Sequence, residues 1–297
     1  MIKLFFVFLS GCILSAGPVA AQHPLRQRLA EIVDGKKATV GLSIRILETG
    51  DTVSFNGGLR FPMQSVYKFH LALAVLDLVD RGKLSFNKKI FLKKGDLLPG
   101  THSPLRDKYP SANVAVSLDD LLRYTVGQSD NNGCDILFRL VGGTQYVNEY
   151  IKKLGMRDVA IVATEEEMHR DSSIQFNNYS SPKSATALLL KFAEGKVLKR
   201  SSTEYLMDVM RKAISGPKKL KGLMPGGTVV AHKTGYSGTD DKGLTYATND
   251  IGIVTLPNEN HMVISVFVSR SREPEAVNDR MIAELAKAGF DWFNKRN

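Results

Sequence analysis

One stretch of sequence decides the fold: SVYKFHLALAVLDLV, at residues 65–79. From Tyr67 to Val79 its apolar density is too high and its length too great for a strand. Arg81-Gly82 then ends the stretch with a cation and a typical C-cap residue. The pattern predicts a buried helix that begins at Ser65.

Strand patterns lie on both sides of this helix, near the two ends of the chain. Residues 39–47 alternate apolar and polar side chains with a period of two, and Gly50-Asp51 turns the chain into a partner strand at 52–55. Segments 228–233, 244–256 and 261–269 are rich in Val, Ile and Thr. An amphipathic helix is expected at 273–294. Both chain ends should therefore contribute to one sheet.

The middle of the chain has a helical texture. Helical patterns occupy 118–125, 134–141, 143–154, 182–192 and 202–214, whereas residues 164–181 are polar and lack periodicity. We expect a long loop there, and such loops are often functional.

The expected fold class is α+β. An antiparallel sheet from both chain ends is flanked by the terminal helices and carries an inserted all-helical lobe. We expect residues 22–62 plus 206–297 to form the sheet lobe and 63–205 the helical lobe. The cleft between two lobes is a common ligand site.

The composition fits a soluble globular protein. The 297 residues are 43% hydrophobic and 24% charged, which excludes collagen-like and wholly disordered chains. The net charge of +10 suits anionic partners, although a solvated basic surface explains it equally simply. The densest basic run, Lys218 to Lys221, is too short for a nucleic-acid footprint. We therefore expect no nucleic-acid partner, and we expect a monomer.

The first 21 residues resemble a cleaved secretory signal peptide. Lys3 precedes an apolar segment at 4–14, and small residues precede Gln22. Export to the periplasm is expected, without a membrane span. Alternatively, residues 9–12 resemble a lipoprotein processing box that would leave Cys12 lipidated. After cleavage before Gln22 only Cys134 would remain, so no internal disulfide is expected.

Three short motifs carry the candidate chemistry. The first is Ser65-Val66-Tyr67-Lys68, whose spacing of three places a hydroxyl and an amine on one helix face. A serine becomes a good nucleophile when a neighbouring base takes its proton, and a buried amine can act as that base. Alone the pattern is weak, since such spacings recur on helices by chance.

The second motif is Ser129-Asp130-Asn131, between two expected helices. Its hydroxyl could relay a proton to a leaving nitrogen, and the Asn131 amide could bind a substrate carbonyl. These residue types are also common in turns and helix caps.

The third motif is Lys233-Thr234-Gly235, at the end of an expected strand. Lys233 and Thr234 could bind a substrate carboxylate, while Gly235 would allow a ligand to approach the backbone. The N–H groups of Tyr236 and Ser65 could together form an oxyanion hole. Order and setting make a joint coincidence of the three motifs improbable.

With these motifs the chain resembles the class A serine β-lactamases over its whole mature length. The polar segment 164–181 resembles the Ω-loop of that family, in which a glutamate activates the water that hydrolyses the acyl-enzyme. Counted from Ser129, the matching position is Glu165; a shift of one or two residues would instead give Glu166 or Glu167. The catalytic residues implied are Ser65, Lys68, Ser129 and Glu165.

The chain departs from the commoner family pattern in ways that resemble its cephalosporin-hydrolysing branch. His169 stands in place of a water-holding Asn, and Asn178 in place of a loop-anchoring Asp. The strand after Lys-Thr-Gly lacks the Arg that many relatives use to bind the substrate carboxylate. Lys219 or Lys221 could supply that charge, although each is expected on the surface.

The resemblance implies hydrolysis of β-lactams, with cephalosporins and penicillins as the expected substrates. The alternatives are a penicillin-binding D,D-peptidase with the same three motifs, and an exported lipoprotein that binds without catalysis. No H-x-x-x-H or C-x-x-C pattern occurs, so neither a metal nor a cofactor is expected.

Overall fold

Both ends of the chain supply one antiparallel sheet, which confirms the expected fold class. The computed structural model describes residues 24–295; the expected signal peptide and Cys12 lie outside them. The five strands run in the order β2-β1-β10-β9-β8, so the first strand pairs with the last one, as in Leu42 opposite Val266. Their bounds are β1 Thr39–Ile46, β2 Thr52–Phe55, β8 Val230–Tyr236, β9 Thr245–Thr255 and β10 His261–Ser271.

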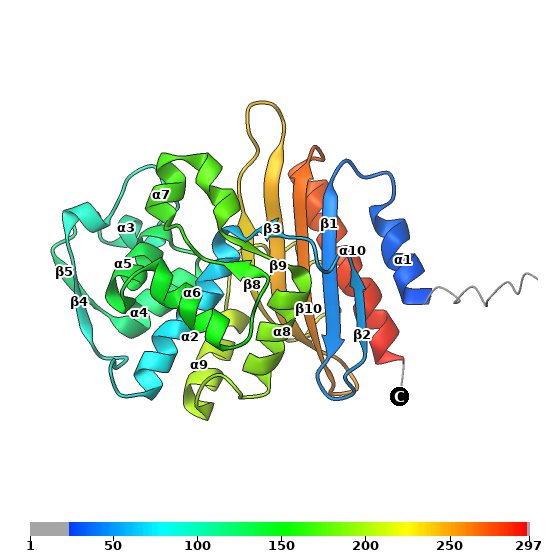
Figure 1. Cartoon of the computed structure of the whole chain (residues 1–297), viewed down its shortest axis with the longest axis horizontal. Helices are drawn as coiled ribbons and strands as arrows, with labels where there is room; N and C mark the ends of the chain where they lie inside the picture. The colour runs from blue at the N-terminus through cyan, green and yellow to red at the C-terminus, as the bar shows by residue number, and fades with distance from the viewer. Residues whose placement is uncertain (1–23, 296–297) are drawn as a thin grey trace, which may run out of the picture.

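The terminal helices cover one face of the sheet (Figure 1). Helix α1 spans Pro24–Val33 and helix α10 spans Glu275–Asn294, and both bury an apolar stripe that includes Leu29 and Ile282. Burial of such stripes on a sheet supplies most of the stability of amphipathic helices.

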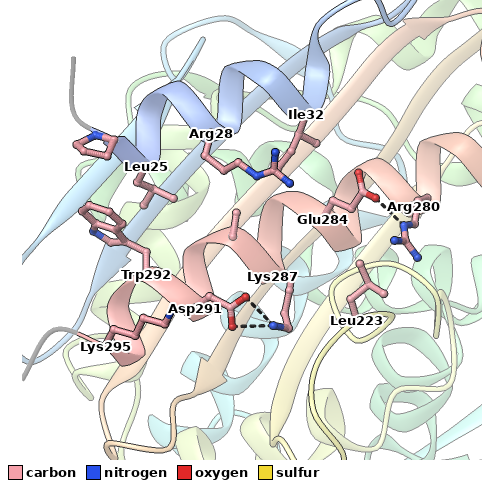
Figure 2. Close-up of a pocket in the computed structure, with 12 residues that line it drawn as sticks. Leu25, Arg28, Ile32, Leu223, Arg280, Glu284, Lys287, Asp291, Trp292 and Lys295 are labelled. Carbon is pink, nitrogen blue, oxygen red and sulfur yellow. Dashed lines mark hydrogen bonds and ion pairs between the residues drawn. The ribbon is translucent and has the colours of Figure 1, made fainter. Parts of the chain in front are cut away.

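A cavity of about 430 Å³ lies between α1 and α10 (Figure 2). The charges of α10 there are paired along the helix: Arg280 with Glu284, and Lys287 with Asp291. None of the three motifs contributes to this cavity.

The opposite face of the sheet carries the helices of the middle of the chain (Figure 1). Helix α8, Pro182–Ala193, packs directly on the sheet, and the Thr186 hydroxyl donates a hydrogen bond to the Ser43 carbonyl (3.1 Å). Helix α2, Tyr67–Asp80, is buried at every position from Tyr67 to Leu76, as the apolar stretch predicted. The remaining longer helices are α5 Asn131–Val141, α6 Thr144–Lys153 and α9 Arg200–Arg211.

Shorter elements complete the framework. Two small sheets contain β3 Phe61–Pro62, β7 Tyr179–Ser180 and β6 Val159–Ala160, and β4 Lys89–Leu92 with β5 Val114–Ser117. The short helices are α3 Pro104–Lys108, α4 Leu118–Leu122 and α7 Glu165–Arg170. The 3₁₀ turns are η1 Gln64–Val66, η2 Lys94–Asp96 and η4 Ser172–Asn177, and η3 Arg123–Gly127 is a π-helical turn.

Three expectations were wrong in detail. Segment 164–181 is not structureless, because Thr164 and Glu167 form a capping box that starts α7. Ser65 does not begin α2 but lies one turn earlier, in η1. The segment expected to form one helix at 118–125 forms α4 up to Leu122 and then the π-helical turn η3. Each element is shorter than the window over which periodicity can be recognised. The boundaries of the two lobes stay a prediction.

Candidate active site

The three motifs meet around one cavity of about 790 Å³, although up to 168 residues separate them in the chain. Turn η1, the segment before α5 and strand β8 each contribute one motif. The residues of the motifs that line this cavity are Ser65, Ser129, Asn131, Thr234, Gly235 and Tyr236.

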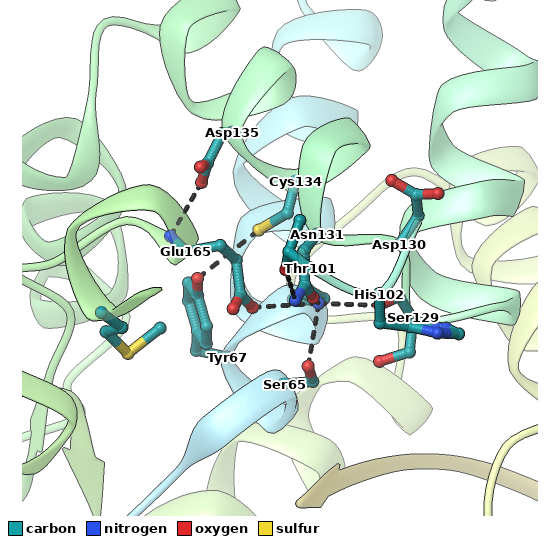
Figure 3. Close-up of polar contacts among 12 residues, drawn as sticks. Ser65, Tyr67, Thr101, His102, Ser129, Asp130, Asn131, Cys134, Asp135 and Glu165 are labelled. Atoms are coloured by element: carbon teal, nitrogen blue, oxygen red, sulfur yellow. Dashed lines mark hydrogen bonds and ion pairs between the residues drawn. The ribbon is translucent and has the colours of Figure 1, made fainter. Parts of the chain in front are cut away.

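Lys68 joins the polar contacts of Ser65, Asn131 and Glu165, the three residues that lie close together in Figure 3. Its side chain is fully buried, and its Nζ lies 2.8 Å from Ser65 Oγ and 2.9 Å from the Glu165 carboxylate. It also donates to the Ser129 carbonyl (2.9 Å) and to Asn131 Oδ1 (2.5 Å). An ammonium has three hydrogens, so these four oxygens share them. Lys68 therefore contacts the Ser65 hydroxyl and the Glu165 carboxylate at the same time.

Ser129 is held in an uncommon backbone conformation. Its φ of +60° lies in the left-handed region, which costs free energy for any residue other than glycine. Hydrogen bonds of the adjacent residue offset this cost: the buried Asp130 carboxylate accepts the N–H groups of Leu105 (2.6 Å) and Gly133 (2.7 Å). As a result the Ser129 hydroxyl accepts a hydrogen bond from Lys233 Nζ at 2.9 Å.

Lys233 is fully buried on β8, and its environment weakens its basicity. Burial, followed by the neighbouring Lys68, lowers the pKa of Lys233 to about 7. Its Nζ lies between Ser129 Oγ and the Thr234 carbonyl. Near neutral pH this lysine can thus bind an anion or release a proton.

Gly235 lets β8 approach the turn that carries Ser65. A Cβ at this position would overlap the Met63 carbonyl oxygen and lie 3.2 Å from the Ser65 nitrogen. Asn249 on β9 fixes the same turn, donating to the carbonyls of Pro62 (2.9 Å) and Met63 (3.1 Å). The backbone of Gly235 and Tyr236 therefore lies beside the Ser65 N–H, where an oxyanion hole was expected.

Only one of the three consecutive acids enters the site. The Glu165 side chain is 10% exposed and faces Lys68, whereas Glu166 pairs with Arg170 (2.7 Å) and Glu167 caps Thr164. This arrangement matches the register counted from Ser129.

Asp135 holds the start of α7 and was not recognised from the sequence. Its two carboxylate oxygens accept the N–H groups of Glu165 and Glu166, each at 2.8 Å. Burial, and then the charge of Glu165, raise the pKa of Asp135 to about 7. The available signal in the sequence was the spacing of Asp135 from Asn131. The two residues are four positions apart on α5, so they lie on the same helix face, which is the face toward segment 164–181.

Asn178 anchors the segment in place of the usual Asp. Its buried amide accepts the N–H groups of Val162 (2.8 Å) and Ala163 (3.0 Å) and donates to the Ala163 carbonyl. His169 is exposed and lines a cavity of about 210 Å³ together with Glu165.

Lys219 is not on the surface, contrary to expectation. It is 4% exposed, lines the large cavity, and its Nζ lies 2.5 Å from the Asp279 carboxylate on α10. Helix α10 thereby stabilises a buried cation that no local pattern indicated. Lys221 instead donates to the backbone carbonyls of Arg211 and Ala213.

The groups around the Ser65 hydroxyl decide what chemistry fits this cavity. An amine lies within hydrogen-bond distance of this hydroxyl, and a carboxylate contacts the same amine. The close approach of Gly235 brings β8 beside the Ser65 N–H. The protein is accordingly a serine hydrolase of the acyl-transfer class.

Comparison with known proteins identifies the branch of that class. The sequence model of the Beta-lactamase enzyme family matches residues 24–293, and the chain belongs to this family. The chain is 39% identical to beta-lactamase VEB-1 of Pseudomonas aeruginosa, over 91% of this chain and 90% of the relative. It is 40% identical to extended-spectrum beta-lactamase PER-1 of the same organism, over 95% and 92%.

Solved structures agree with this assignment. The TLA-1 extended-spectrum beta-lactamase superposes with a TM-score of 0.90 at 50% identity, covering 91% of this chain and 98% of that one. A class A beta-lactamase from Bacteroides cellulosilyticus gives 0.88 at 39% identity, over 91% and 97%. The protein is thus a class A serine β-lactamase.

Proposed function

We propose that the protein hydrolyses cephalosporins and penicillins through an acyl-enzyme on Ser65 and so confers β-lactam resistance. The observation that carries this proposal is the Glu165 carboxylate, which reaches Lys68 within the same polar cluster as Ser65. The descriptions of PER-1 and TLA-1 as extended-spectrum enzymes support a broad cephalosporin range.

Acylation follows from the contacts around Ser65. Its hydroxyl proton passes to Lys68, or to Glu165 through a water molecule, as the oxygen attacks the lactam carbonyl. The carbonyl oxygen becomes an oxyanion that accepts from the N–H groups of Ser65 and Tyr236; one such donor is worth about 3 kcal/mol in the transition state. As the C–N bond breaks, the ring nitrogen takes the Ser129 hydroxyl proton, which Lys233 replaces.

Deacylation requires a base that remains after the first step. Glu165 takes a proton from water while the water oxygen attacks the ester, and Ser65 leaves with the proton that Lys68 took during acylation. Glu165 then releases its proton to solvent and Lys233 takes one up, which restores the starting state. A D,D-peptidase keeps the acyl group of a β-lactam because it lacks an efficient base here. Glu165 therefore favours hydrolysis.

The substrate carboxylate meets the cationic side of the large cavity. Ser129, Lys233 and Thr234 provide hydrogen bonds there, and Asn131 lies where it can donate to a substrate carbonyl. Lys219 adds positive charge in place of the absent Arg, with its own charge balanced by Asp279.

We further propose export to the periplasm after cleavage near residue 21, with lipidation of Cys12 as the alternative, and a monomeric enzyme. None of the helices between residues 24 and 295 is long and apolar enough to cross a bilayer.

Replacement of Glu165 tests the role of the deacylation base. Glu165→Gln keeps the shape but removes the charge, and Glu166→Gln is its matched control on the exposed side of α7. We expect Glu165→Gln to lose about 10² to 10⁴-fold in turnover of a chromogenic cephalosporin while a covalent adduct on Ser65 accumulates in the mass spectrum. Glu166→Gln should resemble the unmodified enzyme. Rapid turnover by Glu165→Gln without an adduct would exclude this role.

A further inference from the structure

A buried contact between a histidine and a carboxylate lies beside the substrate-binding end of β8 and takes no part in the proposed reaction. His232 Nδ1 is 2.9 Å from Asp250 Oδ2 and 3.1 Å from Oδ1, and both side chains are 0% exposed. Asp250 lies on β9 directly opposite Thr234. Burying a carboxylate in the middle of a strand costs free energy, so we expect Asp250 to have a structural or functional role.

His232 orients the Asp250 carboxylate. Its Nδ1 lies within hydrogen-bond distance of both carboxylate oxygens. Among the residues that the structure describes, His232 Nε2 has no hydrogen-bond partner, so Asp250 is the group that holds this imidazole.

Asp250 also holds the loop that brings Lys219 to the cavity. Its Oδ2 accepts the Leu220 N–H at 3.1 Å, so one carboxylate joins β8, β9 and this loop. Ser215, at the start of the loop, bonds the Thr234 hydroxyl at 2.9 Å. Loss of the Leu220 bond would free the segment on which the neighbouring Lys219 sits.

The charge of Asp250 acts on Lys233 as well. Burial and then Lys68 lower the pKa of Lys233, whereas the charges of Asp250 and Glu165 raise it. Burial lowers the pKa of Lys221 as well, and the charge of Asp250 opposes that effect.

We propose that Asp250, oriented by His232, is a positioning residue for anionic substrates: it fixes the loop of Lys219 against the substrate-binding end of β8. The proposal rests on the proposed function, since the anion in question is the carboxylate of a β-lactam. Asp250 does not touch that carboxylate. It acts through Lys219 and Lys233.

Two substitutions separate the effects of charge and of the hydrogen bond. Asp250→Asn keeps an oxygen for the Leu220 N–H and removes the charge, whereas Asp250→Ala removes both. Asp80→Asn is the matched control, because Asp80 caps the Lys199 N–H (2.6 Å) at the far end of α2. All variants are measured for kcat, KM and thermal unfolding between pH 5 and 9.

In the unmodified enzyme, kcat/KM should fall above about pH 7 as Lys233 loses its proton. We expect Asp250→Asn to move this alkaline limb about one pH unit lower, equivalent to a tenfold loss of protonated lysine above the limb. KM should rise about tenfold for a carboxylate-bearing cephalosporin and little for its methyl ester. Asp250→Ala should show the larger rise in KM, and Asp80→Asn should alter only thermal unfolding.

An unchanged alkaline limb with equal KM changes for acid and ester would overturn the proposal. So would an Asp250→Asn variant that differs from the unmodified protein only in unfolding temperature, as Asp80→Asn should. Titration of Lys233 by NMR of ¹³C-labelled lysine, with Lys233→Arg for assignment, gives a readout that needs no turnover. If the unmodified enzyme hydrolyses no β-lactam, the proposed function fails, and the titration still decides whether Asp250 governs Lys233.

Discussion

Replacement of Gly235 by alanine tests the close approach of β8 to the turn that carries Ser65. The added methyl group would overlap the Met63 carbonyl oxygen and lie 3.1 Å from Gln64 Cβ and 3.2 Å from the Ser65 nitrogen. Ordinary contacts of this kind begin at 3.4 Å, and the overlap with the Met63 carbonyl oxygen is the tightest, so β8 must retreat by more than half an ångström. Asn249 ties the turn to β9, which prevents the turn from simply following.

The expected losses follow from this displacement. A misplacement of about 1 Å can cost 10²-fold in rate, so a smaller retreat of the oxyanion donors should lower kcat/KM by about 10 to 100-fold. Overpacking should lower the free energy of unfolding by about 1–3 kcal/mol. The decrease should appear in both acylation and deacylation, because a tetrahedral oxyanion forms in each step.

The assay is stopped-flow acylation and steady-state hydrolysis of a chromogenic cephalosporin, with urea unfolding in parallel. Gly226→Ala is the matched control: Gly226 lies just before β8, and a Cβ there meets nothing within 4 Å. The control should retain activity and stability. If Gly235→Ala acylates within twofold of the unmodified enzyme and unfolds at the same urea concentration, then the contact argued here does not limit the chemistry.

Three further predictions concern the buried carboxylates. Asp135→Ala leaves the N–H groups of Glu165 and Glu166 without their acceptor, so deacylation should slow about tenfold or more. The accumulation of acyl-enzyme measures this rate, and an unaltered deacylation rate would contradict the prediction. Because the pKa of Asp135 is raised to about 7, the folded state holds a proton that the unfolded state has lost, and stability should decline from about pH 4 to pH 7. Asp135→Asn should flatten that decline in urea unfolding, and an identical pH profile would refute the sign. Asp130→Ala leaves the N–H groups of Leu105 and Gly133 without an acceptor and should lower the free energy of unfolding by about 3 kcal/mol or more. A loss below about 1 kcal/mol would show that water replaces the carboxylate.

Much of the fold could be predicted from local sequence patterns. The alternating pattern of β1 and the continuous apolar run of α2 can each be recognised within a dozen residues. In the structure β1 is buried on both faces, with only Arg45 exposed, and α2 is buried from Tyr67 to Leu76. The polar segment around α7 could not be resolved in this way. Its elements are short, and side-chain anchors such as Asn178 hold them instead of an apolar stripe.

The polar pair Asn249-Asp250 was a signal that went unused. Both residues interrupt a strand that is otherwise rich in Val, Ile and Thr, and both are fully buried. Polar groups retained in such a position need partners, which the structure supplies as the Met63 carbonyl and His232.

The sequence by itself determined the order of the three motifs and the pairing of Ser65 with Lys68, because a spacing of three on one turn fixes that contact locally. Only the tertiary structure decided that Glu165 rather than Glu166 faces Lys68, that Lys233 reaches Ser129, and that Lys219 is buried beside Asp279. These contacts join residues that are 60 to 104 positions apart in the chain. One of them also distinguishes Glu165 from the identical side chain next to it. They depend on how helices and strands pack, and no local spacing records that packing.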